Sequence, residues 1–192
     1  MICKDKYESE RFVLSHTCNA AIMGGYIRDM ILERPWKDID LFHSVPVDCV
    51  EKCAKGLQSS LLWYKPDGKA VLTRWDAVSK PGYESDFCVM QCKDLPGVQL
   101  ILFSQGYNKR KSNYDTCLSY MHSHFPCTLS RVAMNLEAKP HERVLYMSGV
   151  FEWAVRQQEL EFSAHCPQEY RDRMVSYFPH FTITPPPPSH FF

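Results

Sequence analysis

The stretch MGGYIRDMILERPWKDIDLF, from Met23 to Phe42, decides the interpretation of this chain. It follows the small apolar run CNAAIM, which is typical of a short buried strand, and it opens with the glycine pair Gly24-Gly25. The segment YIRDMILER then carries apolar residues at helical spacing, and Pro35 ends that pattern. The first half of the stretch therefore predicts a strand, a glycine turn and a short helix.

Two aspartates, Asp38 and Asp40, lie in the second half of the stretch, on the alternating segment KDIDLFH. Alternation predicts a strand. On a strand, residues two apart point to the same face, so both carboxylates would lie side by side. Such a pair repels itself unless a cation lies between the two groups. Hard divalent ions such as Mg²⁺ or Mn²⁺ prefer oxygen ligands and bring substrate phosphates with them. The D-x-D pattern taken alone also fits a solvated edge strand.

The glycine pair adds a second feature to the same segment. Glycine accepts positive φ and lets a backbone approach a ligand closely. A helix that starts after such a turn offers N–H groups and a dipole that favour phosphate. Gly24 and Gly25, followed by the aspartate pair, thus predict binding of a nucleoside triphosphate together with a metal ion.

This joint pattern resembles the signature of the nucleotidyltransferase superfamily related to DNA polymerase beta. It is most similar to the head domain of the CCA-adding enzymes and poly(A) polymerases. The resemblance implies that the glycine pair and the helix hold the triphosphate, that an Arg-Asp pair braces the site, and that the D-x-D binds Mg²⁺. In this chain the residues concerned are Gly24, Gly25, Arg28, Asp29, Asp38 and Asp40. Lys37, beside the D-x-D, is a candidate phosphate contact or an exposed lysine at the start of a strand.

The chain departs from that family at the third carboxylate, which the family carries on a later antiparallel strand. The segment VQLILF has Gln99 at the corresponding place. Gln99 shares a strand face with Ile101 and Phe103, so we expect it to face the site with the two aspartates as the catalytic set. Asp76 and Asp86 are candidate replacements for the missing carboxylate.

A second departure lies in FPCTLSRVAMN, from Phe125 to Asn135, which has the outline of the family's sugar-contact motif. Pro126 and Cys127 stand where acidic and aromatic residues are expected. Only about forty residues follow position 150, so the long helical region that holds tRNA in the CCA-adding enzymes is not expected. The layout looks more like small stand-alone proteins of this superfamily in phages and large DNA viruses.

The rest of the pattern predicts an α/β (α+β) fold, a mixed and mostly antiparallel sheet with helices packed on it. Helices are expected over 4–16, 26–34, 47–61, 113–125, 150–162 and 167–178, and strands over 18–23, 37–43, 61–65, 70–78, 86–92, 98–104, 128–137 and 142–148. We expect a nucleotidyltransferase domain over 1–148, a helical extension packed on it over 149–184, and a proline-rich tail over 185–192. The segment TITPPPPSHFF is predicted to be an extended end, either solvated or a docking peptide, and not a packed helix or a central strand.

Composition gives predictions about partners, cellular location and the state of the cysteines. With 22 basic and 22 acidic residues among 192, the net charge is zero and does not indicate nucleic acid as a partner. The cluster Lys109–Lys111 is a local candidate for a nucleic-acid contact, or a solvated loop. No signal peptide and no membrane span are recognised, so we expect a cytoplasmic protein whose nine cysteines stay reduced and unpaired. Their spacing does not fit a zinc site, and Trp63, Trp75 and Trp153 are expected in the core.

Taken together, these features predict a Mg²⁺-dependent (or Mn²⁺-dependent) nucleotidyltransferase that uses an NTP. The acceptor stays open between an RNA 3′ end, a protein and a small molecule. The alternative is a catalytically impaired, phage-type protein that keeps the nucleotidyltransferase shell and acts by binding a host target.

Overall fold

A seven-stranded mixed sheet forms the centre of the protein, in the order β5-β6-β7-β2-β1-β8-β9. The computed structural model describes residues 3–46, 49–56, 61–78, 87–104 and 110–184. The strands are β1 (Ala21–Met23), β2 (Ile39–Ser44), β5 (Trp75–Ala77), β6 (Phe87–Cys92), β7 (Val98–Phe103), β8 (Val132–Asn135) and β9 (Leu145–Met147). The β2–β7 pair is parallel, and the other five neighbouring pairs are antiparallel. The predicted fold class, a mixed and mostly antiparallel sheet with helices, is confirmed.

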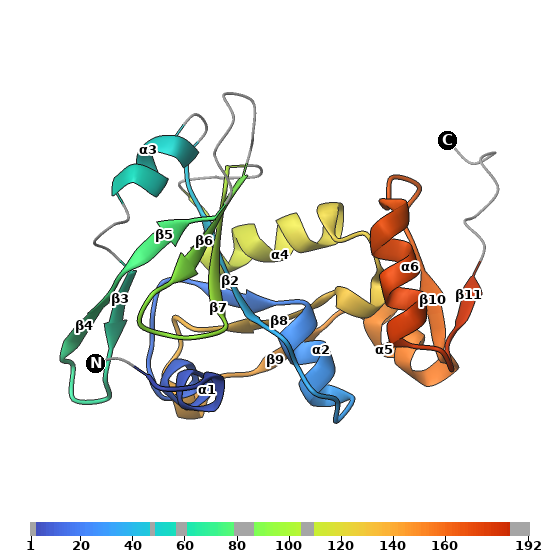
Figure 1. Cartoon of the computed structure of the whole chain (residues 1–192), viewed down its shortest axis with the longest axis horizontal. Coiled ribbons are helices and arrows are strands. Elements are labelled where there is room, and N and C mark those ends of the chain that lie inside the picture. The colour runs from blue at the N-terminus through green and yellow to red at the C-terminus, as the bar shows by residue number, and fades with distance from the viewer. Residues whose placement is uncertain (1–2, 47–48, 57–60, 79–86, 105–109, 185–192) are drawn as a thin grey trace.

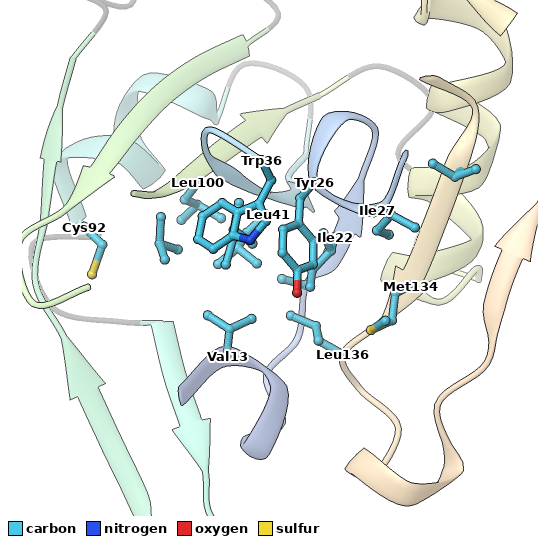
Figure 2. Close-up of a cluster of buried hydrophobic side chains, with 14 of the residues drawn as sticks. Val13, Ile22, Tyr26, Ile27, Trp36, Leu41, Cys92, Leu100, Met134 and Leu136 are labelled. Atoms are coloured by element: carbon cyan, nitrogen blue, oxygen red, sulfur yellow. The ribbon is translucent and has the colours of Figure 1, made fainter. Parts of the chain in front are cut away.

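Side-chain alternation gives the sheet two apolar faces. On one face Ile22 and Leu41 belong to a large core cluster that includes Val13 of α1 (Lys6–Ser15) and Tyr26 of α2 (Gly25–Ile31). Figure 2 shows these residues gathered around Trp36. The other face packs a smaller cluster against α4 (Asn113–His124), which lies across the sheet in Figure 1.

Helix α1 is fixed at both ends. The Asp5 side chain accepts hydrogen bonds from the backbone N–H groups of Tyr7 and Glu8, both at 2.9 Å, as an N-cap. At the other end the Arg143 guanidinium donates to the carbonyl of Leu14 at 2.9 Å and also to that of His16. A guanidinium presents several donors in a fixed plane, so one side chain satisfies carbonyls that the helix end leaves unpaired.

The segment 70–78, predicted as one strand, is two strands. β4 (Ala70–Thr73) pairs with β3 (Leu61–Tyr64) in a separate two-stranded sheet, and β5 joins the main sheet. The break falls at Arg74, whose backbone N–H and guanidinium both bond to the Asp94 carboxylate, at 2.9 and 2.6 Å. This local ion pair turns the chain between the two sheets.

Three helix or strand boundaries also differ from prediction. Helix α3 (Val50–Gly56) begins at Val50 and not at the expected residue 47, and residues 57–60 lie outside the described part. The expected strand 128–137 begins with a 3₁₀ turn at Thr128–Ser130 before β8. The expected helix 150–162 ends early: α5 (Gly149–Gln157) stops because Gln158 takes a left-handed conformation with φ of 53°.

After Gln158 the chain forms β10 (Glu159–Glu161), then α6 (Gln168–Tyr177), then β11 (Thr182–Thr184). β10 and β11 pair in parallel, so residues 182–184 are extended, as predicted, and form one strand of a two-stranded sheet in which Thr182 and Ile183 are exposed. Residues 185–192 lie outside the described part of the chain. Figure 1 shows α5, α6, β10 and β11 together at the end of the molecule opposite the β3–β4 hairpin.

The predictions made from composition concerned the cysteines, the tryptophans and membrane-spanning segments. All nine cysteines are free, and six of them are buried. Trp63 and Trp75 are core residues, at 0% and 1% exposure, but Trp153 is 58% exposed and the prediction that it is buried is wrong. Among the described residues, no helix is both long and apolar enough to cross a membrane.

Candidate active site

A pocket of about 520 Å³ lies where β1 ends, α2 begins, and β2 and β7 start. It brings together the eight residues predicted to hold the nucleotide and the metal or to act in catalysis, namely Gly24, Gly25, Arg28, Asp29, Lys37, Asp38, Asp40 and Gln99. The remaining lining residues are Met23, Phe42, Phe125, Pro126, Ser130, Tyr170, Arg173, Met174 and Tyr177. The size suits a ligand of nucleotide dimensions.

The glycine turn forms one wall of the pocket. Gly24 has φ of 80° and precedes α2, and its N–H donates to the Val132 carbonyl at 3.0 Å. A Cβ built on Gly24 would lie 3.1 Å from Cε2 of Phe125. Both the positive φ and this close approach require glycine, because an L side chain is strained at that φ and would press on the aromatic ring.

The Arg28–Asp29 pair lies directly under this turn and is nearly buried. Nε and Nη2 of Arg28 donate to the two carboxylate oxygens of Asp29, at 2.7 and 3.0 Å. The third nitrogen, Nη1, lies 3.5 Å from both Ser130 Oγ and Met174 Sδ. Such bidentate geometry is among the stronger hydrogen-bonded pairings. Arg28 therefore links α2 to the 3₁₀ turn and to α6.

Ile39 and Leu41 of β2 point into the large core cluster on one face of the sheet. Asp40, between them, therefore points to the other face, which α4 covers, and Asp38, two residues earlier, lies on the same side. Asp40 is in β2, and Asp38 directly precedes the strand. Burial, and then the neighbouring Asp38 charge, raise the pKa of Asp40 to about 6. Lys37 opposes this shift, with its Nζ 3.3 Å from Asp38 Oδ2. The pair is a site of negative charge that a cation would relieve.

These donors fit one divalent ion. Asp40 in β2 and Asp38 directly before it would supply hard oxygen ligands to an ion such as Mg²⁺, which in proteins usually keeps water and substrate phosphates as its further ligands. Within the described ranges, no group of three histidine, cysteine, aspartate or glutamate side chains is placed to hold a metal. The donor set therefore fits a first ion and offers no further carboxylate for a second.

Gln99 lies beside the Asp38–Asp40 pair. In the parallel β2–β7 pair its Cα partner is Asp40, and in the β6–β7 pair its partner is Gln91. Nε2 of Gln99 donates to Oε1 of Gln91 at 3.4 Å, and Nε2 of Gln91 donates to the Val98 carbonyl at 2.9 Å. Because its Nε2 is bonded to Gln91, the side-chain oxygen of Gln99 is the atom that remains to contact a ligand.

Of the two candidate replacements for the missing carboxylate, only Asp76 lies in the described part of the chain, and it is not at the site. Asp76 is one strand further along, opposite Gln91, and it does not line the pocket. Its carboxylate lies 2.7 Å from Nζ of Lys93 instead. Asp86 lies outside the described residues. Of the basic cluster, Arg110 and Lys111 do not line the pocket, and Lys109 is not described.

Helix α6 contributes residues that the sequence analysis did not identify. Tyr170, Arg173, Met174 and Tyr177 line the pocket from the far end of the chain. The Tyr170 hydroxyl lies 2.9 Å from Ser130 Oγ, and the Tyr177 hydroxyl donates to the Pro35 carbonyl at 2.8 Å. The only sequence signal was a charged helical pattern with two tyrosines, which is equally typical of a solvated helix. The segment recognised as a sugar-contact outline does reach the pocket, through Phe125, Pro126 and Ser130.

No family model matches this sequence, and no curated protein matches it. Solved structures do match its fold. A CCA-adding enzyme with CTP aligns over 95% of this chain and 41% of its own, with a TM-score of 0.53 and 13% identity. A CCA-adding enzyme with ATP aligns over 88% and 35%, with a TM-score of 0.52 and 14% identity. The Thermotoga maritima CCA-adding enzyme complexed with tRNA aligns over 95% and 40%, with a TM-score of 0.50 and 14% identity.

These similarities show the fold. The chain has the nucleotidyltransferase fold of polymerase beta-like proteins, as the resemblance of the Met23–Phe42 stretch predicted. It spans about two fifths of the length of these solved chains or less. Low identity leaves the activity to be argued from the site.

Proposed function

We propose that this chain is a metal-dependent nucleotidyltransferase that moves a nucleoside monophosphate from an NTP to an acceptor. The observation that carries the proposal is the Asp38–Asp40 pair in a nucleotide-sized pocket, directly beside the Gly24 turn. The fold on which both features lie has solved examples that include complexes with ATP and CTP. A cytosolic location, which would keep the free thiols reduced, is part of the proposal.

Each residue has a role in this reaction. The backbone at Gly24 and Gly25 receives the triphosphate, and the Arg28–Asp29 pair keeps that turn rigid. Asp38 and Asp40 hold a divalent ion, which supplies charge neutralisation at the phosphates. Lys37, whose side chain is 90% exposed, reaches toward the outer phosphates.

The transfer step is an in-line displacement at the α-phosphorus. An acceptor oxygen forms the new bond to this phosphorus, and the bond from the α-phosphorus to the bridging oxygen breaks. Pyrophosphate leaves with that electron pair. Placing the two reactants in line within one pocket is the main contribution of the protein, because positioning alone lowers a bimolecular barrier by several kcal/mol, about 7–11 at best.

The acceptor classes are an RNA 3′ end, a protein side chain and a small molecule. One solved neighbour is a complex with tRNA, which supports RNA as a class to test. The net charge of zero gives no general attraction to a phosphate backbone. An RNA acceptor would therefore have to be held by local contacts.

Calorimetry with each NTP, with and without Mg²⁺, tests the proposed site. We expect metal-dependent NTP binding that the Asp38→Ala/Asp40→Ala double variant loses, because too few anionic ligands remain for a strongly hydrated ion. Asp76→Ala is the matched control, since this acid lies outside the pocket and pairs with Lys93. Equal binding by the natural protein and the double variant would contradict the site.

Transfer itself is tested with labelled NTPs and a cell lysate. We expect an acceptor to become labelled, and Asp40→Asn to abolish the labelling. If the protein binds NTP and labels nothing under any metal condition, the transferase proposal fails, and a protein that binds nucleotide without turnover takes its place.

A further inference from the structure

The side chain beside the aspartate pair is neutral and is held in place. Gln99 is the direct neighbour of Asp40 across the parallel pair, and its amide is joined to Gln91, which is joined in turn to the Val98 carbonyl. A carboxylate at position 99 would lose the hydrogen bond that the amide N–H₂ now donates, because a carboxylate only accepts. The hydrogen-bonded row of Gln99, Gln91 and the Val98 carbonyl therefore requires an amide at position 99.

The described part of the pocket holds no free general base. Its lining carboxylates are Asp29, Asp38 and Asp40, and no histidine is among the described lining residues. Asp29 is neutralised by Arg28 through two hydrogen bonds. The other two carboxylates are the ligands of the proposed ion. No described lining group is therefore left to take a proton from an attacking hydroxyl.

A second ion could help to remove that proton, because a bound metal lowers the pKa of a water or hydroxyl that it coordinates. The donor set does not fit a second ion, since Gln99 brings no charge and the described residues contain no third acidic ligand at the site. An alcohol, whose proton is held about as tightly as that of water, would stay protonated and a poor nucleophile.

We propose that this site binds a single divalent ion and transfers the nucleotide to an oxygen that is already anionic at neutral pH, a phosphate monoester or a carboxylate. This inference rests on the proposed function and names its acceptor. A phosphate monoester has its second pKa near 6, and a carboxylate near 4, so neither needs a base at pH 7. The anionic oxygen forms the bond to the α-phosphorus, pyrophosphate leaves, and no proton has to be removed.

Arg173 provides the cation that such an acceptor requires. Its guanidinium lies over the Tyr170 ring, 5.1 Å from the centroid, and lines the same pocket. It has no ion pair with any described residue. The Tyr170 hydroxyl is held by Ser130, so the ring is a fixed platform. A guanidinium matches the oxygens of carboxylates and phosphates in a bidentate manner.

Counting bound Mn²⁺ tests the single-ion part without relying on turnover. The titration is followed by electron paramagnetic resonance in the presence of an α,β-methylene NTP analogue. We expect one ion per chain in the natural protein and two in Gln99→Glu. Gln91→Glu is the matched control, since Gln91 belongs to the same row but does not line the pocket, and it keeps one ion. Two ions in the natural protein, or no gain in Gln99→Glu, would overturn the inference.

A lysate experiment tests the acceptor part. The small-molecule and macromolecular fractions are treated with alkaline phosphatase, which is then removed, before labelled NTP and protein are added. Labelling lost after phosphatase identifies a phosphate monoester, and its product shows a ³¹P signal of a pyrophosphate linkage. Labelling that survives phosphatase and is released by hydroxylamine identifies a carboxylate. Labelling that survives both treatments is transfer to a hydroxyl; the inference is then wrong while the transferase proposal stands.

Arg173→Met completes the test. We expect this variant to label the acceptor about tenfold more slowly, as for the loss of a charged hydrogen bond. The analogue's Kd and the count of one Mn²⁺ should stay unchanged. An unaltered labelling rate would remove Arg173 from the acceptor site. If the natural protein binds no NTP at all, the proposed function fails, and this inference fails with it.

Discussion

Replacing Asp40 by asparagine is expected to stabilise the metal-free protein. Asp40 is partly buried beside Asp38, and burial and that neighbouring charge raise its pKa to about 6 from the ordinary value of 3.8. Asparagine has the same shape and no charge to bury. The substitution therefore removes an unfavourable interaction of the native state in the absence of metal.

The sign and size of the effect follow from proton linkage. Below about pH 4 the carboxyl is protonated in both the folded and the unfolded chain, so the two proteins are equally stable. Between about pH 4 and 6 the unfolded chain loses this proton and the folded chain keeps it, so the natural protein loses stability as the pH rises. A shift of roughly two pKa units corresponds to about 3 kcal/mol. Because the carboxylate is partly exposed to solvent, we expect about 2 kcal/mol.

Urea denaturation in EDTA, at intervals between pH 4.5 and 8, measures this difference. The advantage of Asp40→Asn should grow up to about pH 6.5 and stay constant above it. Adding Mg²⁺ should stabilise the natural protein and not the variant, because a ligand that binds only the native state raises its stability. Asp76→Asn, at an exposed ion pair, should change stability by less than about 1 kcal/mol. An Asp40→Asn variant that is less stable at pH 8 in EDTA would refute the reasoning.

Three further substitutions test other parts of the structure. Gly24→Ala should lower the free energy of unfolding in urea by about 1–3 kcal/mol and weaken NTP binding, because the φ of Gly24 is 80°. Gly149→Ala is the control: with open space around it, the substitution should lower this free energy by less than about 1 kcal/mol. Arg143→Met should cost about 2 kcal/mol and increase amide exchange in the last turn of α1, because unpaired carbonyls remain; unchanged exchange would contradict this. Tyr177→Phe should cost about 1 kcal/mol, and no change in stability would show that its hydrogen bond to a backbone carbonyl contributes nothing.

The part of the site that the sequence predicted is the part that is local in the chain. The glycine turn, the helix after it and the D-x-D lie within twenty residues, and each depends on a short-range rule: positive φ at Gly24, and alternation at Asp38 and Asp40. Gln99 was singled out because the resemblance places a carboxylate at its position, and alternation on its strand predicted which face it lies on. Its direct pairing with Asp40 was seen only in the structure, because the register of two parallel strands cannot be predicted from the sequence of either strand.

The parts that escaped prediction depend on contacts distant in sequence or on a single backbone residue. Tyr170 and Arg173 enter the pocket because α6 packs against the 3₁₀ turn, through the bond between Tyr170 and Ser130. Nothing in a charged helix reveals that partner. The end of α5 depends on Gln158 taking a left-handed conformation, which glutamine rarely adopts. The helical pattern of the sequence continues to residue 162, so it did not predict β10.

The position of β1 in the sheet has a consequence for how the protein is made. β1 and β2 emerge from the ribosome well before β8, yet β1 also pairs with β8, and Ala21 and Asn135 are roughly 110 residues apart. At about 5–20 residues per second, β1 waits roughly 5–20 seconds for that partner. Until then one of its edges offers unpaired backbone groups to other chains. The nascent protein should therefore be most prone to aggregation just before residue 135 is released, and the pocket should form only after α6, whose residues line it, has been released.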